Sequence, residues 1–198
     1  MKIAKGALPG ALLSLLVACG TSDQPASELV FVDLDGRTQK PLVCGDQAAN
    51  VMFFITNDCP IANAMAPEIQ AIVNAHQDSP LQFLLVHVDP DISNAIAGQH
   101  AKDFQLRLPI VLDHRHDLVR RLGITITPEV AVWSNDDGLF YRGRINDLFA
   151  DLGQKRRAPT SHDLRDALQA LLTHGKLANQ RTQAIGCDIP DPSPDQGK

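Results

Sequence analysis

The chain lacks several features that would assign it to large functional classes. It has 18 Lys and Arg residues against 23 Asp and Glu, so it is a poor candidate for binding nucleic acid. Its basic cluster at 155–157 is short and typical of a solvated loop. We find no internal repeat, no phosphate-binding loop, no pair of catalytic carboxylates and no calcium-loop spacing among the aspartates.

The N-terminus carries an apolar run, from Gly6 to Ala18, that is too short to cross a bilayer as a helix. Lys2 and Lys5 precede this run, and Cys19 follows it directly. A positive start, a short apolar stretch and a cysteine at the cleavage position are typical of bacterial lipoprotein signals. We therefore expect residues 1–18 to be a signal peptide that the mature protein has lost.

Cys19 is the predicted site of lipidation, and residues 19–28 are the predicted flexible tether to a membrane. Gly20 stands where an aspartate would favour retention at the inner membrane, so analogy with other lipoproteins favours the outer membrane, facing the periplasm. Ordinary signal cleavage, which would leave Cys19 free or buried, is the alternative.

The mature part is expected to form a single domain. Roughly 180 residues suit one hydrophobic core rather than two. We place the domain at 29–175, followed by a C-terminal tail at 176–198 that contains Cys187 and ends in a stretch rich in Pro and Asp.

The middle of the chain alternates between strand and helix patterns. Compact apolar runs indicate buried strands, and apolar residues at spacings of three and four indicate helices. The expected strands lie at 29–34, 51–55, 81–88 and 109–112, and the expected helices at 61–76 and 92–104. Pro67 falls inside the first helix and should kink it. This alternation favours an α/β fold with helices on both faces of a central sheet.

The second half of the chain changes character. Strand patterns at 130–133 and 139–144 are joined by a polar, glycine-containing loop, as in a β-hairpin. Thr160 and Asp163 then resemble a capping box that opens a leucine-rich helix, and Gly175 ends that helix.

Four local features together resemble the thioredoxin-like redoxins, including the alkyl hydroperoxide reductase/thiol-specific antioxidant family. They are Cys59-Pro60 at a strand-to-helix junction, Pro67 eight residues later, Thr127-Pro128 before the hairpin, and the stretch 141–147 on the closing strand. The resemblance covers roughly residues 29–172. It implies a thioredoxin-like fold, a central mixed sheet flanked by helices, with an N-terminal extension and a C-terminal helix plus tail.

Cys59 is the predicted nucleophile. A helix N-terminus carries partial positive charge and unpaired N–H groups, which favour the thiolate over the thiol. Such a thiolate can attack a peroxide oxygen or a disulfide sulfur, and a second thiol must then remove the product. The alternative is a buried structural thiol.

Two further residues are suggested by the resemblance to peroxidases of this family. Thr56 matches the threonine that holds the peroxide, although the proline expected four residues upstream is replaced by Met52. The family's arginine would fall near Tyr141, and Arg142 lies one position on. A shift of one residue points a strand side chain to the other face, unless a bulge restores it.

The remaining cysteines leave several pairings open. Ala62 stands three residues after Cys59, so the Cys-x-x-Cys pair of conventional dithiol oxidoreductases is absent. We favour Cys187 as the resolving partner of Cys59. A permanent bridge from Cys187 to either Cys59 or Cys44 is the alternative, and Cys44 can also be a buried small hydrophobe.

Pro128 is expected to follow a cis peptide bond, as the resemblance implies. A cis bond there would leave a backbone edge beside Cys59 free to receive substrate. An ordinary trans proline in a turn is the alternative.

His87, His114 and His116 are candidate metal ligands together with Cys59, as in copper-delivering thioredoxin-fold proteins. That pattern needs two cysteines in the loop, and this chain supplies one. We therefore predict no metal and no cofactor, and interpret the stretch 114–117 as a solvated turn before a helix.

The sequence thus predicts a thiol-dependent oxidoreductase of the cell envelope, with peroxide as the preferred oxidant. In this interpretation Cys59 is the attacking residue, Thr56 and Pro128 shape its pocket, and Cys187 is the resolving residue. Arg142 is a further candidate catalytic residue. The expected partners are a peroxide or disulfide substrate, a thiol reductant and a membrane, with no nucleic acid. A periplasmic thiol–disulfide or copper-delivery factor is the first alternative, and a non-catalytic binding module whose cysteines are staples is the second.

Overall fold

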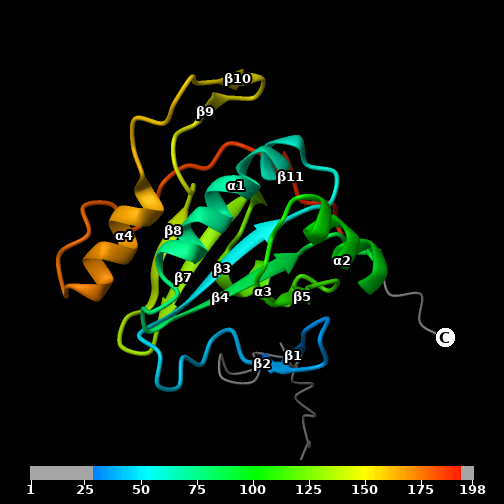
Figure 1. Ribbon diagram of the computed structural model, residues 1–198, viewed down its shortest axis with the longest axis horizontal. Helices are drawn as coiled ribbons and strands as arrows, with labels where there is room; N and C mark the ends of the chain where they lie inside the picture. Colours follow the sequence, from blue (N-terminus) through cyan, green and yellow to red (C-terminus); the bar gives the residue numbers. More distant parts are fainter. Residues whose placement is uncertain (1–28, 193–198) are drawn as a thin grey trace, which may run out of the picture.

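Five strands form a mixed sheet at the centre of the computed structural model, which describes residues 29–192 (Figure 1). They are β3 (Ala49–Ile55), β4 (Leu81–His87), β5 (Ile110–Leu112), β7 (Glu129–Ser134) and β8 (Gly138–Gly143). In the order β5-β4-β3-β7-β8, β3 runs parallel to β4 and antiparallel to β7. The predicted α/β class with a central mixed sheet is confirmed.

Some of the predictions fall outside the described residues. These are the signal peptide at 1–18, lipidation at Cys19, the tether at 19–28 and the last part of the tail at 193–198. Between residues 29 and 192, no helix is both long and apolar enough to cross a membrane.

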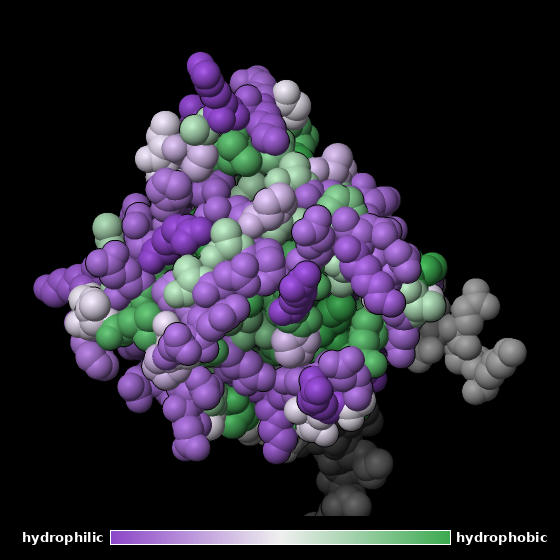
Figure 2. Space-filling model, in the orientation of Figure 1, coloured by the Kyte–Doolittle hydropathy of each residue, from purple (hydrophilic) through white to green (hydrophobic). Residues whose placement is uncertain are grey.

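Helices cover both faces of the sheet. They are α1 (Pro60–Ala75), α2 (Asn94–Asp103), α3 (Asp117–Leu122) and α4 (Asp163–Leu172). Buried residues of α1, α2 and α4 belong to one core cluster, and those of α3 belong to the other. In the same view as Figure 1, Figure 2 shows a mostly hydrophilic surface over α1, with hydrophobic residues in smaller patches.

Strand β3 lies between the two core clusters. Val51, Phe53 and Ile55 belong to the cluster that α1 joins, whereas Met52 and Phe54 belong to the cluster that α3 joins. All seven residues of β3 are buried. A strand covered on both faces is apolar at consecutive rather than alternate positions, and the run from Val51 to Ile55 has the pattern that predicted it.

Helix α1 carries the apolar stripe that the sequence predicts. Ile61, Met65, Ile69 and Ile72 are buried against the core. Pro67 lies inside the helix, which continues through it to Ala75. The helix therefore starts directly after the predicted nucleophile and is held to the sheet along its length.

Within residues 29–192, six short strands lie outside the central sheet. They are β1 (Phe31–Val32) with β2 (Thr38–Gln39), β9 (Phe149–Asp151) with β10 (Gln154–Lys155), and β6 (Ile126–Thr127) with β11 (Cys187–Asp188). The strand expected at 29–34 is therefore only the two-residue β1. The β9–β10 hairpin projects from the body of the molecule (Figure 1).

The start of α4 differs from the expected capping box. Its N-cap residue is His162, whose side chain makes no capping hydrogen bond. Thr160 instead donates its N–H group to the carboxylate of Asp147 at 2.6 Å, and Asp163 accepts from Arg144 at 2.8 Å. The capping prediction was wrong because both polar side chains make tertiary contacts: the Thr160 hydroxyl donates to Asp147, and the Asp163 carboxylate binds Arg144.

Candidate functional site

Cys59 is the N-cap residue of α1. Its backbone is extended, with φ −73° and ψ 109°, and its sulfur accepts the N–H of Ala62 at 3.4 Å. Pro60 occupies the first helical turn, where a missing N–H removes no helical bond. Cys59 is 1% exposed. The strand-to-helix junction thus holds a buried sulfur at the positive end of a helix.

Pro128 lies next to this sulfur, after a cis peptide bond from Thr127. The carbonyl oxygen of Thr127 is 3.1 Å from Sγ of Cys59. The resemblance had therefore indicated the cis geometry correctly, and the main chain before Pro128 borders the sulfur directly.

Cys187 forms a disulfide with Cys59, and their Cα atoms are 6.0 Å apart across a sequence separation of 128 residues. The strand β11 carries Cys187 to this place by pairing antiparallel with β6, in a register that sets Cys187 opposite Thr127. The tail does reach Cys59, and the resolving role of Cys187 stays a prediction. Cys44 is the free cysteine of the described part of the chain; it is buried, and burial raises the pKa of its thiol.

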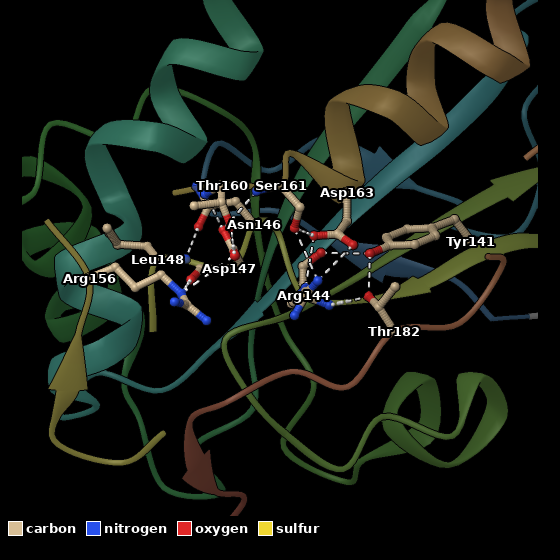
Figure 3. Close-up of polar contacts among 10 residues, drawn as sticks. All are labelled: Tyr141, Arg144, Asn146, Asp147, Leu148, Arg156, Thr160, Ser161, Asp163 and Thr182. Atoms are coloured by element: carbon tan, nitrogen blue, oxygen red, sulfur yellow. Dashed lines mark hydrogen bonds and ion pairs between the residues drawn. The ribbon is translucent and has the colours of Figure 1, made fainter. Parts of the chain in front are cut away.

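Backbone hydrogen bonds to β8 hold the tail on its way to Cys59. Arg142 in β8 accepts the N–H of Thr182 at 3.1 Å through its carbonyl oxygen, and its own N–H donates to the carbonyl of Gln180 at 2.9 Å. The hydroxyl groups of Thr182 and Tyr141 lie 2.6 Å apart (Figure 3). In Figure 1 the red segment after α4 runs from the β8 side of the molecule towards the start of α1. The tail is thus attached to β8 before it reaches Cys59.

Thr56 is buried beneath the loop that leads to Cys59. Its hydroxyl lies 3.0 Å from the hydroxyl of Thr127, and the two share a hydrogen bond. Thr56 therefore lies close to the site, and in this disulfide form its hydroxyl is engaged with the residue before Pro128.

Arg142 is not brought to Cys59. Its guanidinium pairs with Glu129 at 3.2 Å and donates to the carbonyl oxygens of Leu122, at the end of α3, and Gly123. In β7 its partner is Ala131, a residue of the α3-side cluster. The strand pairing does shift just before Arg142, yet the side chain remains on the face opposite α1.

Arg144 is a cationic residue on the Cys59 side that the sequence analysis did not single out. With Pro128, Ile61 and Met65 it lines a small cavity beside the start of α1. Its guanidinium binds Asp163 through Nε at 2.8 Å and Nη2 at 3.1 Å (Figure 3). These hydrogen bonds raise the pKa of Arg144 and compensate its charge.

A second polar cluster holds the segment that carries the projecting hairpin. Asp147 accepts N–H groups from Thr160 at 2.6 Å and Ser161 at 2.9 Å, and Arg156 donates to its carbonyl oxygen at 2.9 Å (Figure 3). Hydrogen bonding by the Thr160 hydroxyl and the Ser161 N–H holds the pKa of Asp147 far below its ordinary value. The two ends of the segment around β9 and β10 are therefore joined at one carboxylate.

Two side chains, Asp89 and Asn63, hold the loop before Cys59, and each of them contacts a histidine. The N–H of Asn57 donates to Asp89 at 3.1 Å, and Nδ1 of His87 lies 3.1 Å from the same carboxylate. The carbonyl of Asn57 accepts from Asn63 at 3.2 Å, and Asn63 in turn contacts Nε2 of His100 at 2.8 Å. Burial lowers the pKa of His100, which favours its neutral form. These residues position the loop. Of the two histidines, the sequence analysis named only His87, and it did so as a candidate metal ligand.

The other two histidines have backbone partners. His114 and His116 contact the carbonyl oxygens of Ile92 and Val88 at 2.8 and 2.7 Å, respectively. His116 is buried, so the solvated turn expected at 114–117 was wrong at this residue. Over residues 29–192, the structure brings together no group of three His, Cys, Asp or Glu side chains suited to a metal ion.

Comparison with solved structures identifies the fold. The chain resembles a hypothetical protein from Sinorhizobium meliloti (TM-score 0.72, 20% identity, covering 83% of this chain and 91% of that one). It is similar to an uncharacterized protein from Geobacillus kaustophilus (TM-score 0.70, 21% identity, 83% and 89%). A secreted Mycobacterium tuberculosis disulfide oxidoreductase also matches (TM-score 0.52, 16% identity, 76% and 98%).

The fold is thioredoxin-like. Comparison of the sequence with protein-family models and with curated proteins finds no match. The structural similarity therefore establishes the architecture, and the chemistry has to be argued from the site. In the thioredoxin-like frame, Cys59 at a helix start, the cis-proline Pro128 and the disulfide partner Cys187 lie within one small region.

Proposed function

We propose that the protein is a thiol–disulfide oxidoreductase that cycles between the Cys59–Cys187 disulfide and the corresponding dithiol. The observation that carries this proposal is the disulfide itself, formed at the N-terminus of α1 and beside the cis-proline Pro128. Ala62 occupies the position of the second cysteine in a Cys-x-x-Cys pair. The tail supplies the second cysteine instead, as Cys187.

Reduction of a substrate disulfide takes two exchange steps. The Cys59 thiolate attacks one substrate sulfur, forms a mixed disulfide and releases the other substrate sulfur as a thiolate, which takes up a proton. The Cys187 thiolate then attacks Sγ of Cys59, closes the internal disulfide and releases the second substrate thiolate. Two electrons pass from the protein dithiol to the substrate. The N-terminus of α1 and the N–H of Ala62 favour the negative charge on Cys59.

A thiol reductant regenerates the dithiol by attack on Cys187. Cys187 is half-buried, whereas Cys59 is 1% exposed, so the Cys187 sulfur is the accessible end of the disulfide. Attack there releases Cys59 as the thiolate, which is the leaving group that the helix N-terminus stabilises. A second thiol of the reductant then frees Cys187.

Peroxide reduction is the second candidate, favoured by the single cysteine at the helix start with Thr56 nearby. It would convert Cys59 to a sulfenic acid, which Cys187 would condense to the same disulfide with release of water. The arrangement of the other residues supports this candidate less: Thr56 is bonded to Thr127, and Arg142 is bonded to Glu129 on the opposite face of the sheet.

The experiment that tests the proposal compares two oxidants on the reduced protein. We expect the disulfides of insulin to be reduced with formation of the Cys59–Cys187 bridge, Cys59→Ser to abolish the reaction, and Cys187→Ser to accumulate a mixed disulfide on Cys59. Cys44→Ala is the matched control and should react as the wild type does. Fast oxidation by hydrogen peroxide without insulin reduction would establish the peroxidase instead. A bridge that native protein does not open in excess dithiol would indicate a permanent staple.

We also propose a location in the cell envelope, with a lipid anchor on Cys19 in the outer membrane. The signal pattern of residues 1–19 supports it, and a disulfide persists best in an oxidising compartment. The similar Mycobacterium tuberculosis protein is described as secreted. Mass spectrometry of the protein extracted from membranes should find a lipid-modified N-terminal cysteine, and Cys19→Ala should abolish this modification. An unmodified Cys19 would refute the anchor.

A further inference from the structure

Strand β11 occupies the place that a substrate must take. A mixed disulfide between Cys59 and a substrate has the same Cys59 Sγ–S bond that Cys187 now makes. The antiparallel pairing with β6 sets the second cysteine opposite Thr127, so main-chain hydrogen bonds, rather than the cysteine side chain alone, deliver its sulfur to Cys59. In the described part of the chain, β6 pairs with β11 and with no other strand. When β11 leaves, an unpaired strand edge remains, and an extended polypeptide can add to such an edge.

The residue before Cys187 makes the closest approach to this edge. At Gly186, a Cβ atom would overlap the carbonyl oxygen of Thr127, and it would lie 2.6 Å from the Thr127 carbonyl carbon and 3.1 Å from the nitrogen of Pro128. All three are backbone atoms, and the Thr127 side chain is held by a hydrogen bond with Thr56. The edge therefore cannot move aside easily, and only glycine fits at this position.

The surroundings of the tail favour a polypeptide over a small molecule. Ile185, two residues before Cys187, packs against the hydrophobic core and lines the small cavity that Arg144 shares with Pro128. On the other side, a hollow of about 390 Å³ is lined by the tail, by Ile126 and by Leu152, a residue at the β9–β10 hairpin that is 65% exposed. The charged side chains of Arg142, Glu129 and Asp151 line it as well. An extended segment has mainly apolar contacts available on one side of its reactive cysteine, and both apolar and charged contacts on the other.

We infer that the tail is an internal mimic of the substrate, and that the protein selects disulfides in extended polypeptide segments with glycine immediately before the reactive cysteine. This inference rests on the proposed thiol–disulfide exchange. The strand β11 closes the edge in the oxidised protein and must leave it for each turnover. The contacts of Gln180 and Thr182 with Arg142 in β8 lie upstream of the released part, so Cys187 stays tethered near Cys59 for the second step.

The first test uses the reduced Cys187→Ser protein, in which the mixed disulfide cannot be resolved. Two symmetrical disulfide-linked peptide dimers are offered, with the sequences Ala-Ile-Gly-Cys-Asp-Ile and Ala-Ile-Ala-Cys-Asp-Ile. Cys59 attacks one peptide sulfur, keeps that peptide and releases the other as a thiol, and mass spectrometry follows the adduct. We expect the glycine peptide to react at least about tenfold faster, because misplacement of the reacting sulfur by about 1 Å slows a reaction strongly. Equal rates would overturn the inference.

A small disulfide, bis(2-hydroxyethyl) disulfide, separates this inference from the proposed function. This molecule has no peptide backbone and therefore no residue that could meet the Thr127 edge. Its reaction with the wild-type protein tests only the exchange chemistry at Cys59. If neither this disulfide nor insulin is reduced, the proposed function fails. If exchange occurs and is lost in Cys59→Ser, yet the two peptides react equally, only the glycine selectivity fails.

The second test changes the tail itself. Gly186→Ala should keep β11 away from β6, and so slow closure of the Cys59–Cys187 disulfide at least about tenfold while it speeds the reaction of reduced Cys59 with the glycine peptide. Gly98→Ala is the matched control, because a Cβ there would make only an ordinary 3.7 Å contact with Leu34. Normal closure in Gly186→Ala would contradict the close approach on which the inference depends.

Discussion

The hydroxyl groups of Thr56 and Thr127 lie 3.0 Å apart and are both buried. This hydrogen bond joins the loop that leads to Cys59 to the residue whose carbonyl borders the Cys59 sulfur. It thereby connects two segments of the site that are 71 residues apart in sequence.

We predict that Thr56→Val destabilises the protein by about 1–3 kcal/mol, because it leaves the Thr127 hydroxyl buried without a partner. The double variant Thr56→Val/Thr127→Val should lose less unfolding free energy than the sum of the two single losses. Replacing both partners leaves no hydroxyl group buried without a hydrogen bond. Urea unfolding of the four proteins measures this coupling. Additive losses would mean that the two hydroxyl groups do not depend on each other.

Reduction of the Cys59–Cys187 disulfide should lower the stability strongly. In the chain-entropy model, a bridge that closes a loop of more than 100 residues stabilises by about 4–5 kcal/mol, and this bridge spans 128 residues. Reduced wild type, Cys59→Ser and Cys187→Ser should then unfold at similar urea concentrations, below that of the oxidised protein. Cys44→Ala should keep the full difference between oxidised and reduced forms. If the difference in urea midpoint between the oxidised and reduced forms also disappears in Cys44→Ala, the bridge belongs to another pair of cysteines.

Arg142 is expected to stabilise the fold and to leave the chemistry at Cys59 unchanged. Its partner Glu129 is 3% exposed, so Arg142→Met leaves a buried carboxylate unpaired, at a cost of about 3–5 kcal/mol. Adding Glu129→Gln should recover part of this loss, because the charge is then gone. The rate of Cys59 oxidation, measured well below the unfolding transition, should stay within about threefold of wild type. A large loss of rate in a stably folded variant would restore the peroxidase role of Arg142.

Asp147 should make the stability depend on pH in the acid range. Its folded pKa lies below the unfolded value of about 3.9, so its contribution is complete above that value and is lost as the pH falls towards the folded pKa. Asp147→Asn should therefore be less stable than wild type by about 1–3 kcal/mol at pH 7, and by less at pH 3. Urea unfolding at the two pH values measures the difference. A constant difference would mean that the charge of Asp147 is not what matters.

Local patterns in the sequence determined much of this protein. The apolar run in β3 and the spacing of Ile61, Met65, Ile69 and Ile72 specify a buried strand and the helix after it, because burial on two faces or on one stripe leaves a regular pattern. The place of Cys59 at that junction follows from the same pattern. The position of Cys59 at the helix start was therefore recognisable before any contact was known.

The tertiary structure decided the rest, because the remaining contacts join distant segments. Strands β6 and β11 have two residues each, too few to show any periodicity, and their pairing alone brings Cys187 to Cys59. The face that Arg142 takes depends on the register between β7 and β8, and a shift of one residue reverses it. The need for glycine at 186 arises only from the closeness of the Thr127 backbone, which no local sequence pattern records.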